Sequence, residues 1–206
     1  RDIMKIDRIK IKIGPSDLSN IFWNTILENA FLKQKTFQAE FFKKIDSLEE
    51  LRKESDKNTG SISSSTSWMI FSTTLFFQPK IIMEVGSFIG KSTLSMGIAT
   101  DFYSENNECQ IYCCDHSNKI HLPNYCKANI NQFHKTSSTE MLNSIPNDIK
   151  FDLVHLDGWL QKEDFDTIKN HLHKKTIFVL DDFEGIEKGT VNYLNLVNNL
   201  IISRNS

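Results

Sequence analysis

The stretch KIIMEVGSFIGKSTLSMGIA, residues 80–99, decides the fold. It opens with an apolar run at 81–85 that is too brief for a helix, and Gly86 and Gly90 follow before a second apolar-periodic stretch. This pattern predicts a buried strand, a glycine turn and a helix that begins near Lys91. Glycine lets the backbone turn sharply and approach a ligand, and the free N–H groups of the helix face the same crevice. We therefore predict a turn that binds a nucleotide-type cofactor.

The spacing of the glycines separates the classes of nucleotide-binding turn. A P-loop has four residues between its glycines, whereas Gly86 and Gly90 enclose only three. A dinucleotide fingerprint has a glycine where Phe88 stands. The pattern that remains is acidic-x-Gly-x-x-x-Gly-x-Ser, which starts at Glu84 and ends at Ser92. A βα turn without a ligand is the alternative, because short glycine patterns recur by chance.

Composition and charge narrow the class of protein. The chain has 206 residues and a formal net charge of −2, so it is long enough for one domain with an elaboration and offers no electrostatic footprint for nucleic acid or an anionic membrane. The four cysteines lack paired C-x-x-C spacing and predict reduced core residues of a cytoplasmic protein. No apolar run reaches the ~20 residues of a membrane span. No signal peptide is recognisable, and the start at Arg1 without Met leaves a removed leader open.

The N-terminal region differs in pattern from the rest of the chain. Alternating isoleucines predict a short strand at 9–13, and apolar residues at three- and four-residue intervals predict one or two amphipathic helices over 17–57. We place an N-terminal strand and helical cap at 1–60 and a Rossmann-like domain at 61–206. The helices pack on that domain or form a homo-oligomer surface. The Ser-rich stretch 58–67 joins the two regions.

Strand-like and helix-like segments alternate along the second region. We expect strands at 81–85, 110–114, 131–134, 151–156 and 176–180, and helices at 68–77, 92–103, 123–130, 138–145, 162–173 and 188–199. Repeated βα units require a mostly parallel sheet with helices on both faces. The predicted fold class is therefore α/β, Rossmann-like, with an added N-terminal helical region. Beyond residue 199 only one further strand fits.

Polar residues follow the predicted strands at one edge of this sheet. Ligands in such folds bind beyond the carboxyl ends of the strands. The strands are followed in turn by Gly86, Asp115, Ser137 with Ser138, Asp157, and Asp181 with Asp182. Clustered carboxylates repel one another unless a cation or ligand neutralises them. We therefore expect the binding site at this edge.

Asp115 is the strongest candidate for a cofactor contact. It directly follows the apolar run IYCC and is placed to accept hydrogen bonds from both hydroxyls of an adenosine ribose, worth roughly 1.5–3 kcal/mol each. A solvated carboxylate at a strand end is the alternative. Ser138 lies beside the adenine edge, or it caps the helix whose apolar face begins at Met141.

These motifs together resemble class I S-adenosylmethionine-dependent methyltransferases. HLDGW and VLDDF resemble the metal site of catechol O-methyltransferase and, through the Asp-Asp pair, the macrocin-type sugar O-methyltransferases. The resemblance covers about residues 60–195. It implies that S-adenosylmethionine is bound by the set Glu84, Gly86, Ser87, Phe88, Gly90, Ser92, Asp115, Ser137, Ser138 and Asp157. It also implies that the segment before the first strand folds over the methionine portion, where hydroxyls of residues 63–66 would reach the carboxylate.

The resemblance further implies a Mg²⁺ ion held by three carboxylates, those of Asp157, Asp181 and Asp182. The ion would bind two oxygens of a hydroxylated small molecule, such as a sugar or natural-product intermediate, and lower the pKa of one hydroxyl. The catechol enzyme has a lysine base three residues after the first of these aspartates, where this chain has Leu160. Lys162 or His155 is the substitute, and we assign catalysis to Asp157 and Lys162.

Two other functions stay open. The run Gly90-Lys91-Ser92 with Asp181 and Asp182 superficially matches a P-loop nucleotide hydrolase. A non-catalytic cofactor-binding module on the methyltransferase fold is the second. Nucleotide preference discriminates the first of these, and methyl transfer to any acceptor discriminates the second.

Overall fold

The computed structural model describes residues 35–105, 108–183 and 186–201. The chain divides into two compact units, Arg1–Gln38 and Ala39–Ser206, and residues 39–60 therefore belong to the same unit as the sheet. The description below concerns this second unit. The strand predicted at 9–13 and the first part of the predicted helical region lie outside the described residues.

The sheet has five parallel strands in the order β3-β2-β1-β4-β5. They are β1 (Ile81–Val85), β2 (Gln110–Asp115), β3 (Asn129–His134), β4 (Phe151–Leu156) and β5 (Leu172–Leu180). Val85 pairs with Cys114 on one side and with Leu156 on the other, so β1, β2 and β4 end level with one another. The strand order reverses between β1 and β4, which is the place where open α/β sheets bind ligands.

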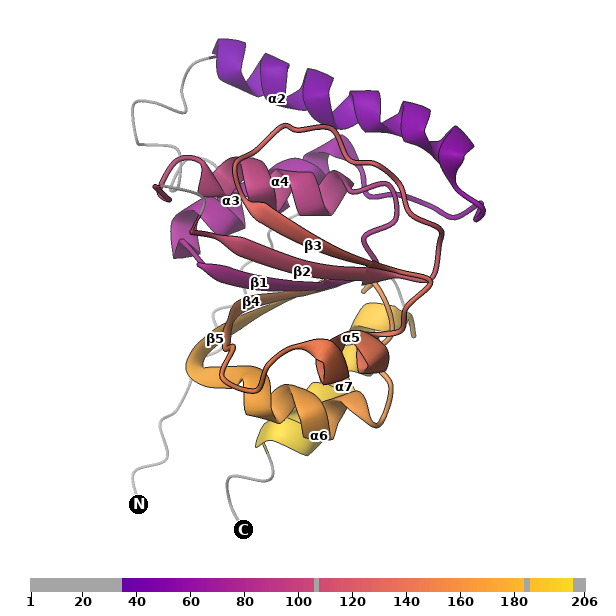
Figure 1. Ribbon diagram of the computed structural model, residues 1–206, viewed down its shortest axis with the longest axis vertical. Helices are drawn as coiled ribbons and strands as arrows, with labels where there is room; N and C mark the ends of the chain where they lie inside the picture. Colours follow the sequence, from indigo (N-terminus) through magenta and orange to yellow (C-terminus); the bar gives the residue numbers. More distant parts are fainter. Residues whose placement is uncertain (1–34, 106–107, 184–185, 202–206) are drawn as a thin grey trace, which may run out of the picture. The chain divides into compact units, whose positions relative to one another are not determined.

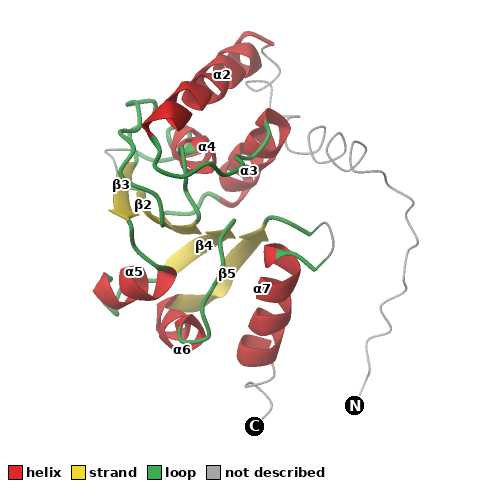
Figure 2. Ribbon diagram, turned by 90° about the vertical axis from the view of Figure 1, so that its right-hand side faces the viewer, coloured by secondary structure: helices red, strands yellow, loops and turns green. Residues whose placement is uncertain are grey.

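Helices cover both faces of this sheet, which confirms the predicted fold class (Figure 1 and Figure 2). On one face lie α3 (Ser64–Phe77) and α4 (Lys91–Thr100), and on the other lie α5 (Ser138–Ser144), α6 (Asp164–Ile168) and α7 (Lys188–Leu196). Neighbouring strand residues point to opposite faces. Ile82 accordingly packs in the core with Ile70 and Met96, whereas Met83 packs with Met141 and Phe165.

The N-terminal helical elements end in an aromatic cluster. α2 (Lys35–Ser47) is followed by the 3₁₀ helix η1 (Leu48–Glu54). Phe41 is buried, and its ring centroid lies 5.0 Å from that of Trp68 and 5.1 Å from that of Phe71, both on α3. Apolar residues at helical spacing in 39–51 therefore serve as core, and they bring η1 next to the glycine turn.

The helix predicted at 123–130 is wrong. Residues 116–128 contain no helix, and β3 already begins at Asn129. A side chain at Gly90 would meet Leu122, and one at Gly97 would meet Cys126. The two glycines thus leave room beside α4 for the non-helical segment 116–128. Its side chains cover this part of α4 in place of the predicted helix.

Three further boundaries differ from the prediction. The segment expected to be helical over 162–173 is shorter: α6 ends at Ile168, the 3₁₀ turn η2 (Lys169–His171) follows, and Leu172 already pairs with Phe151. α4 ends at Thr100. Beyond α7, the π-helical turn η3 (Val197–Ile201) continues the helix past its predicted end at residue 199.

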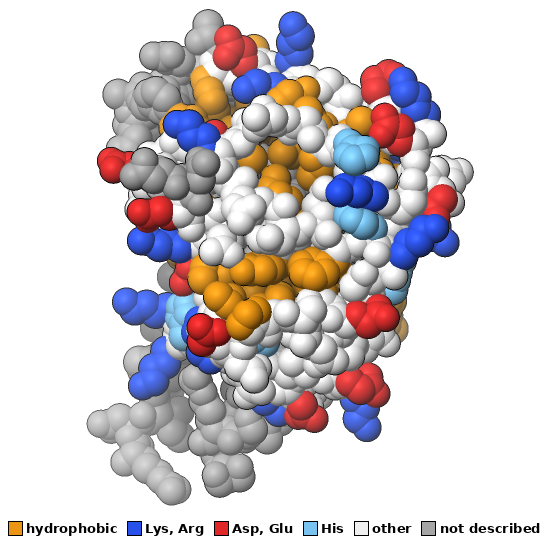
Figure 3. Space-filling model, viewed as in Figure 1, with side chains coloured by type: hydrophobic (Ala, Val, Ile, Leu, Met, Phe, Trp, Pro, Cys, Tyr) orange, Lys and Arg blue, Asp and Glu red, His pale blue; other side chains and the backbone are white. Residues whose placement is uncertain are grey.

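The surface mixes charges of both signs. Figure 3 shows Lys, Arg, Asp and Glu interspersed around the margin of one face, with apolar side chains nearer its middle. All four cysteines are free, and Cys109, Cys113 and Cys114 are buried, which confirms that those three are core residues. Within the described ranges, no helix has the length and apolar character to cross a membrane.

Candidate functional site

A cavity of about 370 Å³ opens at the carboxyl ends of β1, β2 and β4. Four of the predicted cofactor residues line it together, namely Gly86, Asp115, Ser138 and Asp157. The rest of its wall is formed by Lys57, Asn58, Thr59, Val85, Cys114, His116, Thr136, Gly158, Trp159, Gln161 and Lys188. The cavity thus lies where the strand order reverses, as the strand-exit rule predicts.

Gly86 begins the turn at the floor of the cavity. Its φ is +91°, and a Cβ built on it would lie 2.8 Å from the backbone C and O of Asp157. The backbone N–H groups of Gly86 and Ser87 both donate to the Cys114 carbonyl, at 2.9 and 3.2 Å. Only glycine allows the exits of β1 and β4 to approach this closely, which leaves space above them for a ligand.

Asp115 is held rigidly at the end of β2. Its Oδ2 accepts a hydrogen bond from the Phe88 N–H at 2.8 Å, and its Oδ1 accepts one from the Ser117 N–H at 2.7 Å. A carboxylate offers about four acceptor positions, so each oxygen keeps one for a ligand. The glycine turn therefore fixes the direction of the carboxylate that faces the cavity.

The two serines after β3 have different roles. Ser137 is the N-cap of α5: its hydroxyl accepts from the Glu140 N–H, and Glu140 binds back to the Ser137 N–H at 2.8 Å. Ser138 lines the cavity and donates to Asp164 Oδ2 at 2.5 Å. The capping role therefore belongs to Ser137 rather than to Ser138, and Ser137 is not among the residues that line the cavity.

Glu84 and His155 form a buried pair behind the cavity. Both side chains are 1% exposed or less, and Glu84 Oε1 lies 3.1 Å from His155 Nδ1, while Thr93 Oγ1 donates to Glu84 Oε2. Burial lowers the pKa of His155, but the hydrogen bond and charge of Glu84 outweigh it and raise the pKa above its usual value. Neither Glu84, predicted as a cofactor contact, nor His155, predicted as a possible base, lines the cavity, and each is engaged by the other. The two face each other because they are partners across β1 and β4.

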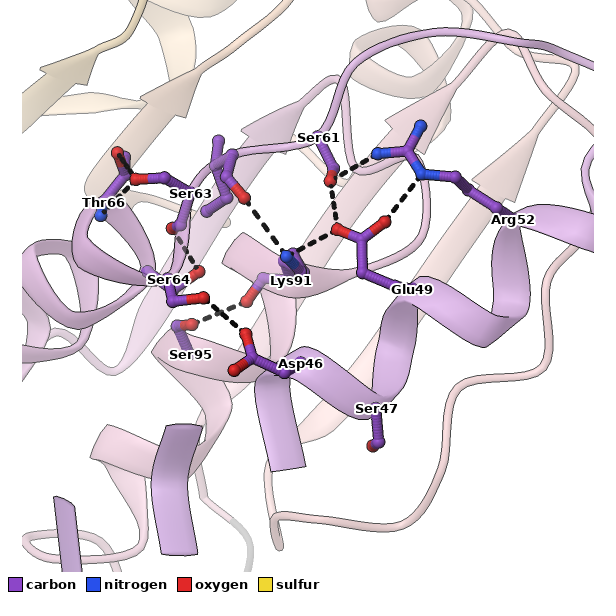
Figure 4. Close-up of polar contacts among 12 residues, drawn as sticks. Asp46, Ser47, Glu49, Arg52, Ser61, Ser63, Ser64, Thr66, Lys91 and Ser95 are labelled. Carbon is purple, nitrogen blue, oxygen red and sulfur yellow. Dashed lines mark hydrogen bonds and ion pairs between the residues drawn. The ribbon is translucent and has the colours of Figure 1, made fainter. Parts of the chain in front are cut away.

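Lys91 is not among the residues that line the cavity, and its ammonium points toward Glu49 (Figure 4). Its side chain is 6% exposed, and its ammonium lies 2.6 Å from Glu49 Oε1 on η1 and 3.4 Å from the Ile62 carbonyl. A P-loop requires its lysine to reach the phosphates. The ion pair with Glu49 removes that function from Lys91 and counts against the P-loop alternative.

Glu49 ties the N-terminal segment to the glycine turn. It accepts hydrogen bonds from Arg52 Nε at 2.7 Å and from the Ser61 hydroxyl at 2.8 Å, and the Arg52 guanidinium lies 5.2 Å from the centroid of the Phe88 ring. Burial raises the pKa of Glu49, but the bonds from Arg52, Lys91 and Ser61 outweigh it and lower the pKa to about 2. Phe88, Gly90 and Ser92, which were predicted as cofactor contacts, are buried and do not line the cavity.

We expect Glu49→Gln to lower the free energy of unfolding by about 1–3 kcal/mol at neutral pH. The buried Lys91 would lose its counter-charge, and the partial exposure of Glu49 keeps the loss below that of a fully buried pair. Because the pKa is lower in the folded chain, this stabilisation is complete above pH ~4.5 and fades as the pH falls toward ~2. Urea titrations of both proteins at several pH values measure it, and a difference that does not shrink below pH ~4 would contradict it.

The Ser-rich stretch 58–67 was predicted to reach the cofactor through residues 63–66. Ser63 is the N-cap of α3 and accepts from the Thr66 N–H at 3.1 Å, so these hydroxyls serve the helix. Residues 57–59, a few positions earlier in the chain, line the cavity instead. The predicted contact of residues 63–66 with the methionine portion stays a prediction, since these residues do not line the cavity.

The three predicted metal ligands are not arranged around an open position. Lys188 Nζ lies 2.9 Å from Asp157 Oδ1, 2.7 Å from the Asp157 carbonyl and 2.8 Å from Asp182 Oδ2. Asp181 Oδ1 accepts from the Asp182 N–H at 2.9 Å. Among the residues that the structure describes, no group of three or more His, Cys, Asp or Glu is placed to hold a metal. The donor set, as arranged here, does not fit Mg²⁺.

Burial and charge oppose each other in this cluster. Burial raises the pKa of Asp157, and Lys188 counteracts it only in part. Burial lowers the pKa of Lys188, but hydrogen bonds to Asp182 and Asp157 outweigh it and raise the pKa. Lys188 therefore stays cationic at neutral pH. The predicted base Lys162 is exposed and does not line the cavity, so the structure gives it no place in the site.

Comparison with known families identifies the part of the chain that forms this site. A family model described as a methyltransferase domain matches residues 83–183, from β1 to just past the end of β5. This segment resembles a methyltransferase domain. The match includes Gly86, Asp115 and Asp157, and it ends before Lys188. No curated protein matches the chain.

Solved structures show that the chain shares its fold with known O-methyltransferases. The O-methyltransferase from Bacillus cereus in complex with SAH has a TM-score of 0.56 at 14% identity, with 85% of this chain and 84% of that chain covered. TomG from Streptomyces achromogenes, in complex with SAM, has a TM-score of 0.55 at 14% identity, with 77% of each chain covered. These likenesses confirm the predicted Rossmann-like fold, and together with the family match they support the predicted resemblance to class I S-adenosylmethionine-dependent methyltransferases.

Proposed function

We propose that the protein transfers a methyl group from S-adenosylmethionine to a hydroxyl oxygen of a small molecule. One observation carries the proposal. A single cavity, at the point where the strand order reverses, is lined by residues at or just beyond the ends of four different strands, namely Gly86, Asp115, Ser138 and Asp157. The solved neighbours bound to SAM or SAH share this fold. They support the cofactor, while the acceptor is inferred from the chemistry of the cavity.

Each lining residue has a role in this proposal. Asp115, fixed by two backbone N–H groups, accepts from the ribose hydroxyls. Ser138 borders the adenine, and Gly86 allows the cofactor to lie against the backbone. Asp157 lies on the remaining side, where its carboxylate receives the acceptor hydroxyl. The cofactor supplies an electrophilic methyl, so the protein's task is to position the acceptor oxygen and remove its proton.

The acceptor side of the cavity combines carboxylate with aromatic surface. Trp159 lines the cavity and is 49% exposed. An aromatic side chain beside a hydroxyl-binding carboxylate suits a ring-shaped hydroxylated molecule, such as a sugar or natural-product intermediate. Magnesium has no part in this proposal, because the arrangement of Asp157, Asp182 and Lys188 does not fit the ion.

Calorimetric titration and a methyl-transfer assay test the proposal. We expect SAM and SAH to bind and ATP not to bind. With an acceptor found by screening, Asp157→Asn should lower kcat by about 100-fold and leave SAM affinity within about threefold. Asp148→Asn, an exposed carboxylate away from the cavity, is the matched control. Binding of ATP alone would favour a nucleotide hydrolase, and SAM binding without transfer to any acceptor would favour a non-catalytic module.

A further inference from the structure

The ammonium of Lys188 has three acceptors for its three N–H groups. Two belong to Asp157, its carbonyl and its Oδ1, and the third is Asp182 Oδ2. All three contacts are between 2.7 and 2.9 Å, the usual range for charge-assisted hydrogen bonds. Lys188 thus joins the end of β4 to the loop after β5, across the wall of the cavity.

The backbone places Lys188 there by close packing. Lys188 is the first residue of α7, and the N–H of Gly189 donates to the Asp182 carbonyl at 3.1 Å. A Cβ at Gly189 would collide with the Asp181 carbonyl oxygen, so only glycine lets α7 begin this close to the strand. Asp182 itself has a φ of +57°, which turns the chain back toward α7. The position of Lys188 is therefore built into the loop.

The positive charge of Lys188 partly neutralises two carboxylates. Asp157 and Asp182 share one cation, and without it two neighbouring, partly buried carboxylates would repel each other. A divalent metal ion between the same carboxylates would do the same work, because both cations supply positive charge at that point. Asp157 Oδ1 is engaged by Lys188, which leaves Oδ2 of this cavity-lining carboxylate as the oxygen available to a ligand.

We propose that Lys188 is a built-in cation that takes the place of a divalent metal, and that it holds Asp157 in position for the acceptor hydroxyl. Lys188 is then a positioning residue, since its own N–H groups are all engaged. The inference rests on the proposed function for the role of Asp157, whereas the replacement of the metal stands on the contacts alone. Methyl transfer by this site should proceed in EDTA.

Metal binding tests the replacement without any assay of activity. Mn²⁺ is titrated into the wild-type chain, Lys188→Met and the exposed control Lys174→Met, with free ion followed by electron paramagnetic resonance. We expect no site in the wild type and the control, and one Mn²⁺ site in Lys188→Met that binds at least about tenfold more tightly than any wild-type background. A wild-type site that Asp182→Asn removes would overturn the proposal, and so would a Lys188→Met variant that binds no Mn²⁺.

Kinetics separate positioning from a merely structural role. With an established acceptor and EDTA present, Lys188→Met should lower kcat about 30-fold or more with SAM affinity retained, and Lys188→Arg should recover part of that loss. Thermal melting confirms that each variant is folded. A wild-type rate that requires added Mg²⁺, or a Lys188→Met variant with full kcat, would overturn the positioning role. A wild type that transfers no methyl group would instead reject the proposed function, and the Mn²⁺ result would stand independently.

Discussion

Gly86→Ala is expected to lower the free energy of unfolding by about 3 kcal/mol or more and to abolish SAM binding. Two costs combine. The residue has φ +91°, which an alanine rarely adopts, and its Cβ would lie 2.8 Å from the backbone of Asp157. Backbone cannot move aside as the end of a flexible side chain can, so β1 and β4 would have to separate at their carboxyl ends. That separation would displace the floor of the cavity.

Gly60→Ala is the matched control for this change. No atom lies within 4 Å of a Cβ built at Gly60, so alanine there should change stability by no more than about 0.5 kcal/mol. Urea unfolding and calorimetric titration with SAM measure both variants. If Gly86→Ala unfolds like the wild type and still binds SAM, the close approach of β1 to β4 at this turn does not hold in solution.

Asp115→Ala is expected to weaken SAM binding by about 100-fold or more. The carboxylate would no longer receive the ribose hydroxyls, and the N–H groups of Phe88 and Ser117 would lose their acceptor. The glycine turn would therefore lose both a ligand contact and an internal support. Titration calorimetry measures the affinity, and SAH should show the same loss because it carries the same ribose.

Asp101→Ala serves as the control for Asp115→Ala. Asp101 also accepts a hydrogen bond from a backbone N–H, that of Lys127 at 2.8 Å, but it does not line the cavity. Its removal should lower stability slightly and leave SAM affinity unchanged. Equal weakening by both variants would mean that the effect comes from general loss of stability. Retention of affinity in Asp115→Ala would reject this residue as the ribose contact.

The sheet and the cavity were predictable because their signals are local. Short apolar runs followed by glycine or aspartate mark the ends of β1, β2, β4 and β5. The rule that ligands bind beyond parallel strand ends places Gly86, Asp115 and Asp157 together. These residues do line one cavity. Asp182 also lies at this edge of the sheet, as the rule predicts, but its carboxylate pairs with Lys188.

The errors arise where a distant partner decides the role of a residue. Glu84 looks like a ligand in its motif, but its partner His155 is 71 residues away and becomes visible only when β1 lies beside β4. Lys91 looks like a phosphate-binding lysine until Glu49 is placed beside it. Lys188 stands in a run of mixed charge, and only the turn at Asp182 brings it to Asp157. The spacing of residues along the sequence does not predict which distant residues will pair.

The hydrogen bonds and the ion pair of Glu49 link the stretch 58–67 thermodynamically to the glycine turn at 86–90. Residues 57–59 line the cavity, and the segment around them is attached to α4 through the Glu49–Lys91 pair and the contact of Arg52 with Phe88. Whatever favours the attached state of this segment must favour an occupied cavity, and by reciprocity a bound ligand must hold the segment more firmly in place. The residues that precede the sheet therefore act as part of the binding equilibrium itself, and a molecule that pulled η1 away from α4 would compete with the ligand without touching it.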